Sequence, residues 1–573
     1  MIEERTRLVG LLLCGYLISF ALAVLCLNLM FGVNPGNREW VRWYWDVLTG
    51  GVQSPIERTI LISTGLALLL ASVLPALVPR FTPWRLDAYG GSKAAWARPA
   101  DVWWLRWRYG VRITRRLRPG IVLGRYGRRG CWITLRSPLF VLCFGPAGEG
   151  KTAGVLIPST LNLPNNSLVV NDPAGEIMDA TKTHRQQLGR IVRLEWGSPN
   201  SQCFNPLMRA NLPTDPVAIC DYIDALASIL IPPSKGNDSS SFFINASRSA
   251  LSAAIGYQVF GCLSADEDTS IGEVLSWLSM LGADSDDEED EDPVGTDLRR
   301  AVDTARNLAM PKRIVEALAS FATARRGTRA DILSTIRDDH LALWRNEYVC
   351  RATATSDLSL AELTNPDGPP VTIYLVVPVA DQERYGKATG VFLEAVYSAL
   401  TRLAYNAPRR PVTLILDELK FIPPLRLVKD GPSILRKFKV NGIYGFQDRG
   451  QVVDVYEQTT LDAFDTNVVA MTIFTLGHLD TAKWVSERVG THWSTKRVQT
   501  GSSMNPAGGA LAPTASESAS REQIALVTAT DAMSLAQGRH LIMFRSKPHR
   551  PVHAHTPFYF KHQPLTRRSR RGG

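Results

Sequence analysis

Apolar residues in this chain form three kinds of pattern, and each predicts a different element. The first kind is two long uncharged runs: residues 8–31 are 24 residues without a charge, and residues 60–78 are 19. Each is long enough to cross roughly 30 Å of hydrocarbon as a helix. The first run is longer than a signal-peptide core, and no small-residue cleavage site follows it. We therefore expect two transmembrane helices.

The second kind of pattern is short and rich in β-branched or aromatic residues, and the third kind has helical spacing. The short runs predict buried strands at residues 137–144, 371–377, 412–416 and 442–446. Helical runs at residues 221–231 and 243–260 lie between the first two of these strands. This arrangement predicts an α/β fold class with a domain that contains helices inserted into the core.

A glycine-rich segment directly follows the first predicted strand. Residues 145–152 read Gly-Pro-Ala-Gly-Glu-Gly-Lys-Thr, which fits the phosphate-loop pattern G-x-x-x-x-G-K-[ST]. The glycines let backbone N–H groups turn toward a phosphate, the lysine would reach the β- and γ-phosphates, and the threonine would bind Mg²⁺. A glycine-rich turn without a ligand is the alternative, but the preceding strand favours a site for ATP and Mg²⁺. The residues expected to form it are Gly145, Gly148, Gly150, Lys151 and Thr152.

Two more predicted strands end in polar residues that complement this loop. The run 412–416 is followed by Asp417 and Glu418. Asp417 would hold Mg²⁺, and Glu418 would orient or deprotonate the attacking water, which favours hydrolysis over nucleotide binding alone. The run 442–446 ends at Gln447, which we expect to sense the γ-phosphate; a polar strand end in water is the alternative.

The spacing of the motifs predicts the domain organisation. Lys151 and Asp417 are 266 positions apart, which is more chain than one compact core needs, so an inserted domain lies between them. Residues 499–518, rich in Gly, Ala, Ser and Pro, are expected to form a mobile loop. The expected parts are a membrane anchor at 1–80 with an outward-facing periplasmic loop between its helices, a nucleotide-binding domain at 81–207 and 347–560, an inserted all-α domain at 208–346 with a solvated acidic loop at 284–292, and a disordered basic tail at 561–573.

The charged residues are distributed unevenly along the chain, and this affects what the net charge indicates about binding partners. The formal net charge is +10, although eight of the nine residues 284–292 are acidic. Residues 80–136 hold 14 Lys or Arg and only two acidic residues, so the positive-inside rule places the chain after the second span in the cytoplasm. Because this surplus fixes topology and can bind anionic lipid, the net charge is poor support for nucleic-acid binding. Eight cysteines without a Cys-x-x-Cys pair favour a reducing compartment.

Further short motifs occur in order along the chain. They are Gly-Ser-Lys-Ala-Ala-Trp-Ala at 91–97, Pro-Gly-Ile-Val-Leu-Gly at 119–124, Asn-Asp-Pro-Ala-Gly-Glu at 171–176 and Phe-Asn-Pro-Leu at 204–207. With the two apolar runs, the phosphate loop and the Asp-Glu strand, they resemble the coupling proteins of type IV secretion systems, the TraG/TraD-like family, over roughly residues 5–560. The chain departs from this family at Ala174, where lysine is usual, and at Glu149, an acid beside the expected phosphates.

The resemblance implies a multi-pass ATPase of the bacterial inner membrane with a RecA-like P-loop NTPase core. Such a protein forms a homo-hexameric ring with ATP between subunits. It recruits a relaxase–DNA complex or an effector protein to a type IV secretion or conjugation channel and powers the transfer by ATP hydrolysis. An arginine of one subunit would stabilise the transferring phosphate on the next; Arg436 is the candidate, and a solvated helix charge is the alternative.

Two other functions stay open from the sequence. One is a translocase of the FtsK/HerA kind that pumps double-stranded DNA without a secretion channel, although no terminal winged-helix module is evident. The other is a nucleotide-binding membrane scaffold with little hydrolysis, which Glu418 and Gln447 disfavour and which Ala174 and Glu149 leave open. The acidic stretch would repel bare DNA and suits a basic protein partner instead.

Overall fold

The computed structural model describes residues 94–570 except 128, 137, 234–238, 284–290, 405–406 and 501–515. The two predicted transmembrane segments, residues 8–31 and 60–78, lie outside the described residues. Within that part of the chain, no helix is long and apolar enough to cross a membrane. Residues 98–104, the first part of helix α4 (Pro99–Tyr109), group with the N-terminal unit, and the remaining described residues form one compact unit.

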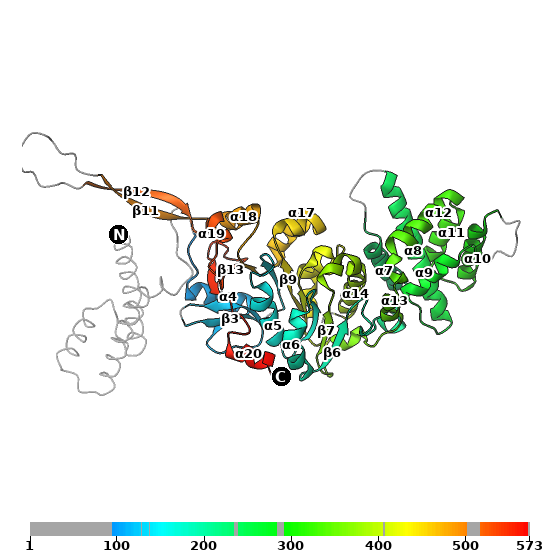
Figure 1. Ribbon diagram of the computed structural model, residues 1–573, viewed down its shortest axis with the longest axis horizontal. Helices are drawn as coiled ribbons and strands as arrows, with labels where there is room; N and C mark the ends of the chain where they lie inside the picture. Colours follow the sequence, from blue (N-terminus) through cyan, green and yellow to red (C-terminus); the bar gives the residue numbers. More distant parts are fainter. Residues whose placement is uncertain are drawn as a thin grey trace, which may run out of the picture. The chain divides into compact units, whose positions relative to one another are not determined.

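A mixed sheet of 12 strands forms the centre of this compact unit (Figure 1). Its order is β1-β3-β2-β14-β13-β10-β4-β9-β8-β5-β7-β6, and the seven strands from β10 to β6 run parallel. The strands are β1 (Val111–Thr114), β2 (Ile121–Tyr126), β3 (Cys131–Leu135), β4 (Phe140–Phe144), β5 (Ser167–Asn171), β6 (Arg190–Leu194), β7 (Val371–Leu375), β8 (Val412–Leu416), β9 (Val440–Phe446), β10 (Ala470–Ile473), β13 (Arg539–Phe544) and β14 (Val552–His555).

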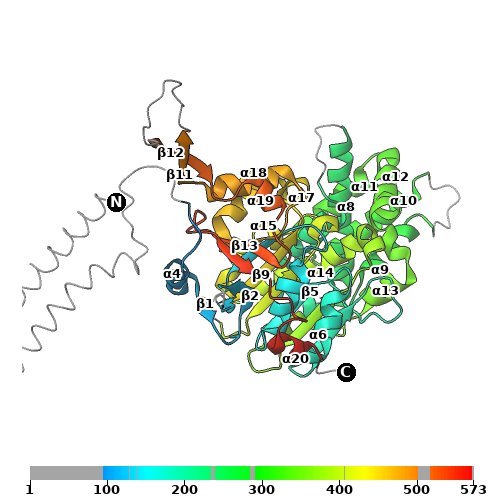
Figure 2. The ribbon, with the colours of Figure 1, turned by 60° about the vertical axis from the view of Figure 1, so that its left-hand side comes forward.

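The central parallel strands are buried along their whole length because helices cover the sheet on both faces. Every residue of β4, β5, β7, β8 and β9 is buried, as expected for the interior of an α/β sheet. Helices that connect these strands pack along the sheet (Figure 2): α5 (Ile157–Leu161), α6 (Glu176–Gln186), α14 (Gln382–Arg402), α17 (Arg449–Asn467) and α18 (Leu479–Val489). The α/β class predicted from the sequence is confirmed.

A group of helices is inserted in the chain between β6 and β7, which remain paired neighbours in the sheet (Figure 1). We call this group, residues 216–354, the helical insert. Within the described residues it holds no strand. Its elements are α7 (Pro216–Leu230), α8 (Ser239–Ser264), α9 (Ile271–Met280), α10 (Pro293–Asn307), α11 (Lys312–Thr323), α12 (Arg326–Ser334), η3 (Thr335–His340), η4 (Ala342–Arg345) and α13 (Glu347–Ala354).

The side chain of Asn205 ties the start of the helical insert to its end. Asn205 is fully buried, and its Nδ2 donates to the carbonyl oxygens of Thr269 at 2.8 Å and Ala354 at 2.9 Å. Its Oδ1 accepts the Leu207 N–H at 2.8 Å, and its own N–H donates to Ser356 Oγ at 2.8 Å. Asn205 belongs to the Phe-Asn-Pro-Leu motif, which therefore has a structural role at the base of the insert.

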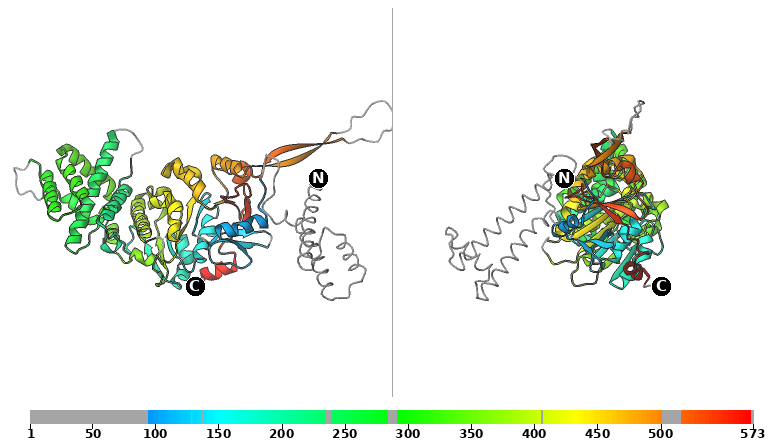
Figure 3. Two further views of the ribbon diagram at one scale, coloured as in Figure 1. Left: turned by 180° about the vertical axis from the view of Figure 1, so that it is seen from behind. Right: turned by 90° about the vertical axis from the view of Figure 1, so that its left-hand side faces the viewer.

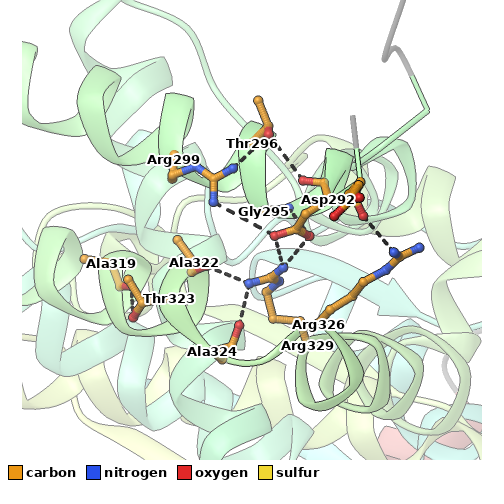
Figure 4. Close-up of polar contacts among 11 residues, drawn as sticks. Asp292, Gly295, Thr296, Arg299, Ala319, Ala322, Thr323, Ala324, Arg326 and Arg329 are labelled. Atoms are coloured by element: carbon orange, nitrogen blue, oxygen red, sulfur yellow. Dashed lines mark hydrogen bonds and ion pairs between the residues drawn. The ribbon is translucent and has the colours of Figure 1, made fainter. Parts of the chain in front are cut away.

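The acidic stretch ends in an ordered ion pair rather than a solvated loop (Figure 4). Residues 284–290 lie outside the described part, but Asp292 is the N-cap of α10 and accepts the Gly295 N–H at 3.2 Å. Its carboxylate also accepts two hydrogen bonds from Nη2 of Arg329, a residue only 4% exposed, and Arg299 lies 3.9 Å away. The expectation of a solvated loop up to residue 292 is therefore wrong for Asp292, because the buried Arg329 needs a counter-charge.

Two segments near the C-terminus are more regular than the sequence predicts. Residues 499–500 and 516–518, the two ends of the predicted loop, belong to β11 (Thr491–Thr500) and β12 (Ser516–Ala525), which pair as an antiparallel ribbon (Figure 3). Residues 501–515 lie outside the described part of the chain. The expected disordered tail contains helix α20 (Gln563–Arg570), which packs on α5 and α6. Arg568 of this helix donates to the Leu161 carbonyl at 3.0 Å and to Asn162 Oδ1 at 2.9 Å. Arg568, one of the arginines that suggested disorder, thus bonds to the C-terminal end of α5.

Candidate functional site

Three of the predicted motifs meet at one edge of the sheet. The phosphate loop follows β4, the Asp417–Glu418 pair follows β8, and Gln447 follows β9. The strand β9 is hydrogen-bonded in parallel to both β4 and β8, so the carboxyl ends of all three lie at the same edge. Ligands of open α/β sheets bind at this edge.

The phosphate loop has the backbone conformation that its glycines permit. Gly148 and Gly150 have φ values of +84° and +96°, which residues with a Cβ rarely adopt. The loop leads into η1 (Thr152–Leu156), a π-helical segment, and then into α5. The Glu149 side chain between the two glycines is exposed.

Lys151, Thr152 and Asp417 form the polar centre of the site. Lys151 is 4% exposed, and its Nζ lies 3.5 Å from the Phe446 carbonyl oxygen and 3.9 Å from Asp417 Oδ1. The Thr152 hydroxyl donates to Asp417 Oδ2 at 2.9 Å. A hydroxyl and a carboxylate are oxygen ligands that suit Mg²⁺, and a buried ammonium beside them suits a phosphate. These side chains therefore fit the ATP and Mg²⁺ that the sequence predicts at this loop.

Glu418 and Gln447 face one another next to this centre. Gln447 Nε2 donates to Glu418 Oε1 at 3.3 Å, and both side chains are half-buried. Glu418 has a left-handed backbone with φ 53° and ψ 55°, which is uncommon for a residue with a side chain. Its N–H donates to Asp417 Oδ1 at 3.1 Å. The two predicted catalytic side chains are thus brought together, in a backbone conformation of the kind found at active sites.

Arg436 is not brought into this group. It lies in the short helix η8 (Leu435–Phe438), before the amino end of β9, and its side chain is exposed. Gln447 follows the carboxyl end of the same strand, so seven residues of β9, about 20 Å of extended chain, separate the two ends. Within one chain Arg436 and the phosphate loop therefore belong to opposite edges of the sheet.

The sequence analysis gave no role to Asn171 and Asp172, which also lie at this edge. Asn171 Nδ2 donates to the Asp417 carbonyl oxygen at 2.6 Å and so fixes the backbone of the Asp-Glu pair. Asp172 Oδ2 accepts the Met178 N–H at 2.7 Å at the start of α6. Burial raises the pKa of Asp172 to about 6, and the charge of Asp417 acts in the same direction. Their place in a short motif at a strand end was the available signal.

A C-terminal segment, residues 556–559, packs on the phosphate loop and was also missed. The Tyr559 N–H donates to the Ala153 carbonyl at 3.2 Å. A Cβ on Gly150 would come within 2.9 Å of the Phe558 ring, and one on Gly154 would come within 2.3 Å of Thr556 Cγ2. The loop and this segment are some 400 positions apart, so no local pattern could indicate their contact.

A mixed α/β sheet with a phosphate loop beside a carboxylate pair at the ends of its parallel strands defines a P-loop protein of the nucleotide-binding class. A family model described as "Type IV secretory system Conjugative DNA transfer" matches residues 108–571. The chain belongs to this family, which confirms the resemblance seen in the sequence.

Curated relatives and solved structures agree with this assignment. A conjugal transfer protein TraG of Escherichia coli is 23% identical over 340 residues, covering 55% of this chain and 49% of that protein. A type IV secretion system-coupling protein VirD4 of Bartonella henselae is 21% identical over 356 residues, covering 61% of this chain and 52% of that protein. The chain thus matches about half the length of these relatives.

Two solved structures of one coupling protein share the fold. A trigonal form of the conjugative coupling protein TrwBdeltaN70 with sulphate has a TM-score of 0.54 at 15% identity, covering 82% of this chain and 96% of that one. TrwB in complex with ADP and Mg²⁺ has a TM-score of 0.52 at 15% identity, covering 74% and 86%. At this identity the likeness is one of fold.

Proposed function

We propose that this protein is an ATP-dependent coupling protein of a type IV secretion or conjugation system. The observation that carries the proposal is the group formed by Lys151, Thr152 and Asp417, with Glu418 and Gln447 beside it. This group combines phosphate binding, Mg²⁺ binding and activation of water at one sheet edge. Binding of ADP and Mg²⁺ by the fold relative TrwB supports ATP and Mg²⁺ as the cofactors here.

Each side chain then has a distinct role in a RecA-like site. Lys151 and the N–H groups of the loop bind the β- and γ-phosphates, while Thr152 and Asp417 hold Mg²⁺. Glu418 orients or deprotonates the attacking water. The Gln447 amide, 3.3 Å from Glu418 Oε1, senses the γ-phosphate and contacts the Glu418 side chain. When bound, Mg²⁺ supplies charge stabilisation for phosphoryl transfer.

The quaternary and membrane parts of the proposal rest on the family. We propose a homo-hexamer in which Arg436 of one subunit approaches the nucleotide of the next; its exposure and its distance from its own site support a role in trans. We also propose an inner-membrane location, with residues 8–31 and 60–78 as transmembrane helices and the bulk of the chain in the cytoplasm. The domain limits 81–207, 208–346 and 347–560 belong to this proposal, with a relaxase–DNA complex or effector protein as substrate and channel components and lipid as further partners.

Turnover of Mg-ATP by the purified full-length protein tests the function. We expect Glu418→Gln to bind nucleotide normally and to lower kcat by at least about 100-fold, the range found for loss of a general base. Lys151→Ala should weaken nucleotide binding and abolish substrate transfer in cells. Phosphate release and equilibrium binding of a fluorescent ATP analogue are the measurements.

Matched controls separate these effects from nonspecific damage. Glu487→Gln removes an exposed glutamate on α18, and Lys182→Ala removes an exposed lysine on α6; both should retain turnover. An unaltered protein that binds the analogue but does not hydrolyse ATP, with or without DNA, would favour the scaffold over the motor.

A further inference from the structure

Three neighbouring strands of the sheet, β2, β14 and β13, place three basic side chains in a line. The register pairs Arg125 of β2 with His555 of β14, and His555 with Arg539 of β13. Residues directly opposite one another on adjacent strands lie on the same face of a sheet. We call Arg125, His555 and Arg539 the cationic row. On the outer side of the row, Arg125 pairs with Trp132 of β3.

The two arginines of the row have no carboxylate partner among the described residues. Arg125 donates through Nε to the Gly130 carbonyl at 2.8 Å and through Nη1 to His562 Nδ1 at 2.9 Å. Its guanidinium lies over the Trp132 ring, 5.2 Å from the centroid. These neutral partners orient Arg125 but supply no negative charge. The Arg539 side chain forms neither a hydrogen bond nor an ion pair within the same part of the chain.

His555 lies between the two arginines and responds to their charge. Its side chain is half-buried, and burial lowers its pKa. The charges of Arg539 and Arg125 lower the pKa further. Like charges that face one another across a sheet are destabilising, so an anion bound at the row would relieve this repulsion.

The other titratable groups around the row are also basic. His553 lies two positions before His555 on the same face of β14, and Lys561 and His562 precede α20 next to Arg125. The pKa values of His553 and His562 are lowered by burial and by neighbouring basic groups, and no carboxylate contributes to these shifts. An anion bound at the row would therefore raise the pKa of His555, and it would bind more tightly as the pH falls.

An exposed tryptophan adjoins the row. Trp96 is 42% exposed, and its ring centroid lies 5.3 Å from that of His553. The segment that carries it is fixed to the sheet, because the Ala97 N–H donates to the Pro551 carbonyl at 2.9 Å. Tryptophan is enriched at the headgroup level of membranes, since its apolar ring carries one polar N–H. Trp96 follows the second predicted span by 18 positions, a length of chain that reaches at most about 65 Å.

We propose that the cationic row binds the headgroup of an anionic phospholipid, with Arg539 and Arg125 donating to the phosphate and Trp96 at the level of the headgroups. Phosphate oxygens are acceptors that guanidinium groups bind strongly. The phosphates of nucleic acid share this chemistry, but the exposed Trp96 and its short distance in sequence from the predicted span favour a lipid. The proposal assigns a site to the lipid partner and rests on the proposed inner-membrane location.

The reaction of His555 with diethyl pyrocarbonate tests the proposal on the full-length protein. This reagent modifies only the neutral imidazole, so the rate of modification against pH, followed by peptide mass spectrometry, gives the pKa of His555. The protein is placed in nanodiscs of phosphatidylcholine, or of phosphatidylcholine and phosphatidylglycerol in equal amounts. We expect phosphatidylglycerol to raise the pKa of His555 by about 1 or more, which is a tenfold change in proton affinity.

Controls separate the row from the general charge of the disc. His478 is exposed at the start of α18 and is measured in the same samples; its pKa should rise much less than that of His555. Arg539→Gln should raise the pKa of His555 in phosphatidylcholine, because a repelling charge is lost, and should at least halve the further rise on adding phosphatidylglycerol. Arg300→Gln removes an exposed arginine that pairs with Asp297 on α10 and should leave both values unchanged.

The outcomes distinguish the row from the proposed function as a whole. Equal pKa values of His555 in the two discs, equal rises at His555 and His478, or an undiminished rise in Arg539→Gln would each overturn the proposal. The same rise in phosphatidylcholine discs with inorganic phosphate or with a duplex oligonucleotide would overturn it too, by assigning the row to a free anion or to nucleic acid. ATP turnover is measured on the same samples. A lipid-dependent rise without turnover would retain the row and exclude the motor, whereas turnover without the rise would exclude the row alone.

Discussion

At the scale of single residues, His540 shows how a side chain outside every motif supports the phosphate loop. It is fully buried, its Nδ1 lies 3.0 Å from Thr556 Oγ1, and its Nε2 lies 2.8 Å from the Leu123 carbonyl oxygen. Because a carbonyl only accepts, Nε2 carries the proton and Nδ1 accepts from the Thr556 hydroxyl. The ring also stacks on Phe474 at a centroid distance of 4.9 Å. Thr556 in turn packs on Gly154, next to the loop.

This geometry predicts a pH dependence of stability. Burial lowers the pKa of His540 to about 4 from an ordinary value of 6.5, with the charges of His553 and His555 acting in the same direction. A pKa that is lower in the folded state means that stability is complete above pH 6.5 and is lost as the pH falls toward 4. Chemical denaturation across this range should therefore show a falling free energy of unfolding.

The variant His540→Gln should make the free energy of unfolding depend less on pH between 6.5 and 4. It should also be less stable than the unaltered protein at neutral pH. His478→Gln, which replaces an exposed histidine at the start of α18, is the matched control and should leave the profile unchanged. An identical profile for His540→Gln and the unaltered protein would contradict the assignment.

At the scale of elements, the cluster around Arg329 holds three helices of the insert together. Arg329 of α12 donates through Nη1 to the Ala322 carbonyl of α11 at 2.8 Å, and through Nη2 to the Asp292 carboxylate that caps α10. Although partial burial raises the pKa of Asp292, the hydrogen bonds from Arg329 and Gly295 bring it below its ordinary value. The last acid of the acidic stretch is therefore ionised and structural (Figure 4).

We expect Arg329→Met to destabilise the protein by about 2 kcal/mol, since the Ala322 carbonyl and the Asp292 carboxylate lose the donor that bonds to them. Arg326→Met is the control, because among the described residues this exposed neighbour donates only to the Glu291 carbonyl, and it should cost less than about 1 kcal/mol. Urea denaturation monitored by circular dichroism measures both. Equal losses of unfolding free energy for the two variants would mean that the Arg329–Asp292 pair does not stabilise the insert more than an exposed arginine does.

At the scale of the whole molecule, the arrangement depends on where the helical insert leaves the sheet. The strands β6 and β7 are paired neighbours in the sheet, although 176 positions separate the end of the first from the start of the second. Asn205 bridges the outgoing and returning chain through hydrogen bonds to Ala354 and Ser356. A bridge of this kind allows a large domain to be inserted in the chain between β6 and β7 without disrupting the pairing of these two strands.

We predict that Asn205→Ala lowers the free energy of unfolding by about 2–3 kcal/mol, because buried backbone groups lose their partners. It should also divide a single thermal transition into two, since the link between insert and sheet is weakened. Differential scanning calorimetry measures both effects. Asn200→Ala, a change at an exposed asparagine shortly before the junction, should retain the unaltered profile; one unshifted transition for Asn205→Ala would exclude the linking role.

The sequence by itself determined the α/β class and the local chemistry of the nucleotide site. A phosphate loop and an Asp-Glu strand end are short-range patterns, since the backbone conformation and the ligand atoms come from residues a few positions apart, such as Gly150, Lys151 and Thr152. The order of these motifs also indicated the family, which the comparison confirmed.

Only the tertiary structure decided which distant residues support that site. The packing of Phe558 against Gly150, the bond from Asn171 to Asp417 and the pairing of Asp292 with Arg329 each join segments with no shared local pattern. Burial and counter-charge are properties of the folded arrangement. The sequence therefore specified which groups are present, and the fold decided which of them meet.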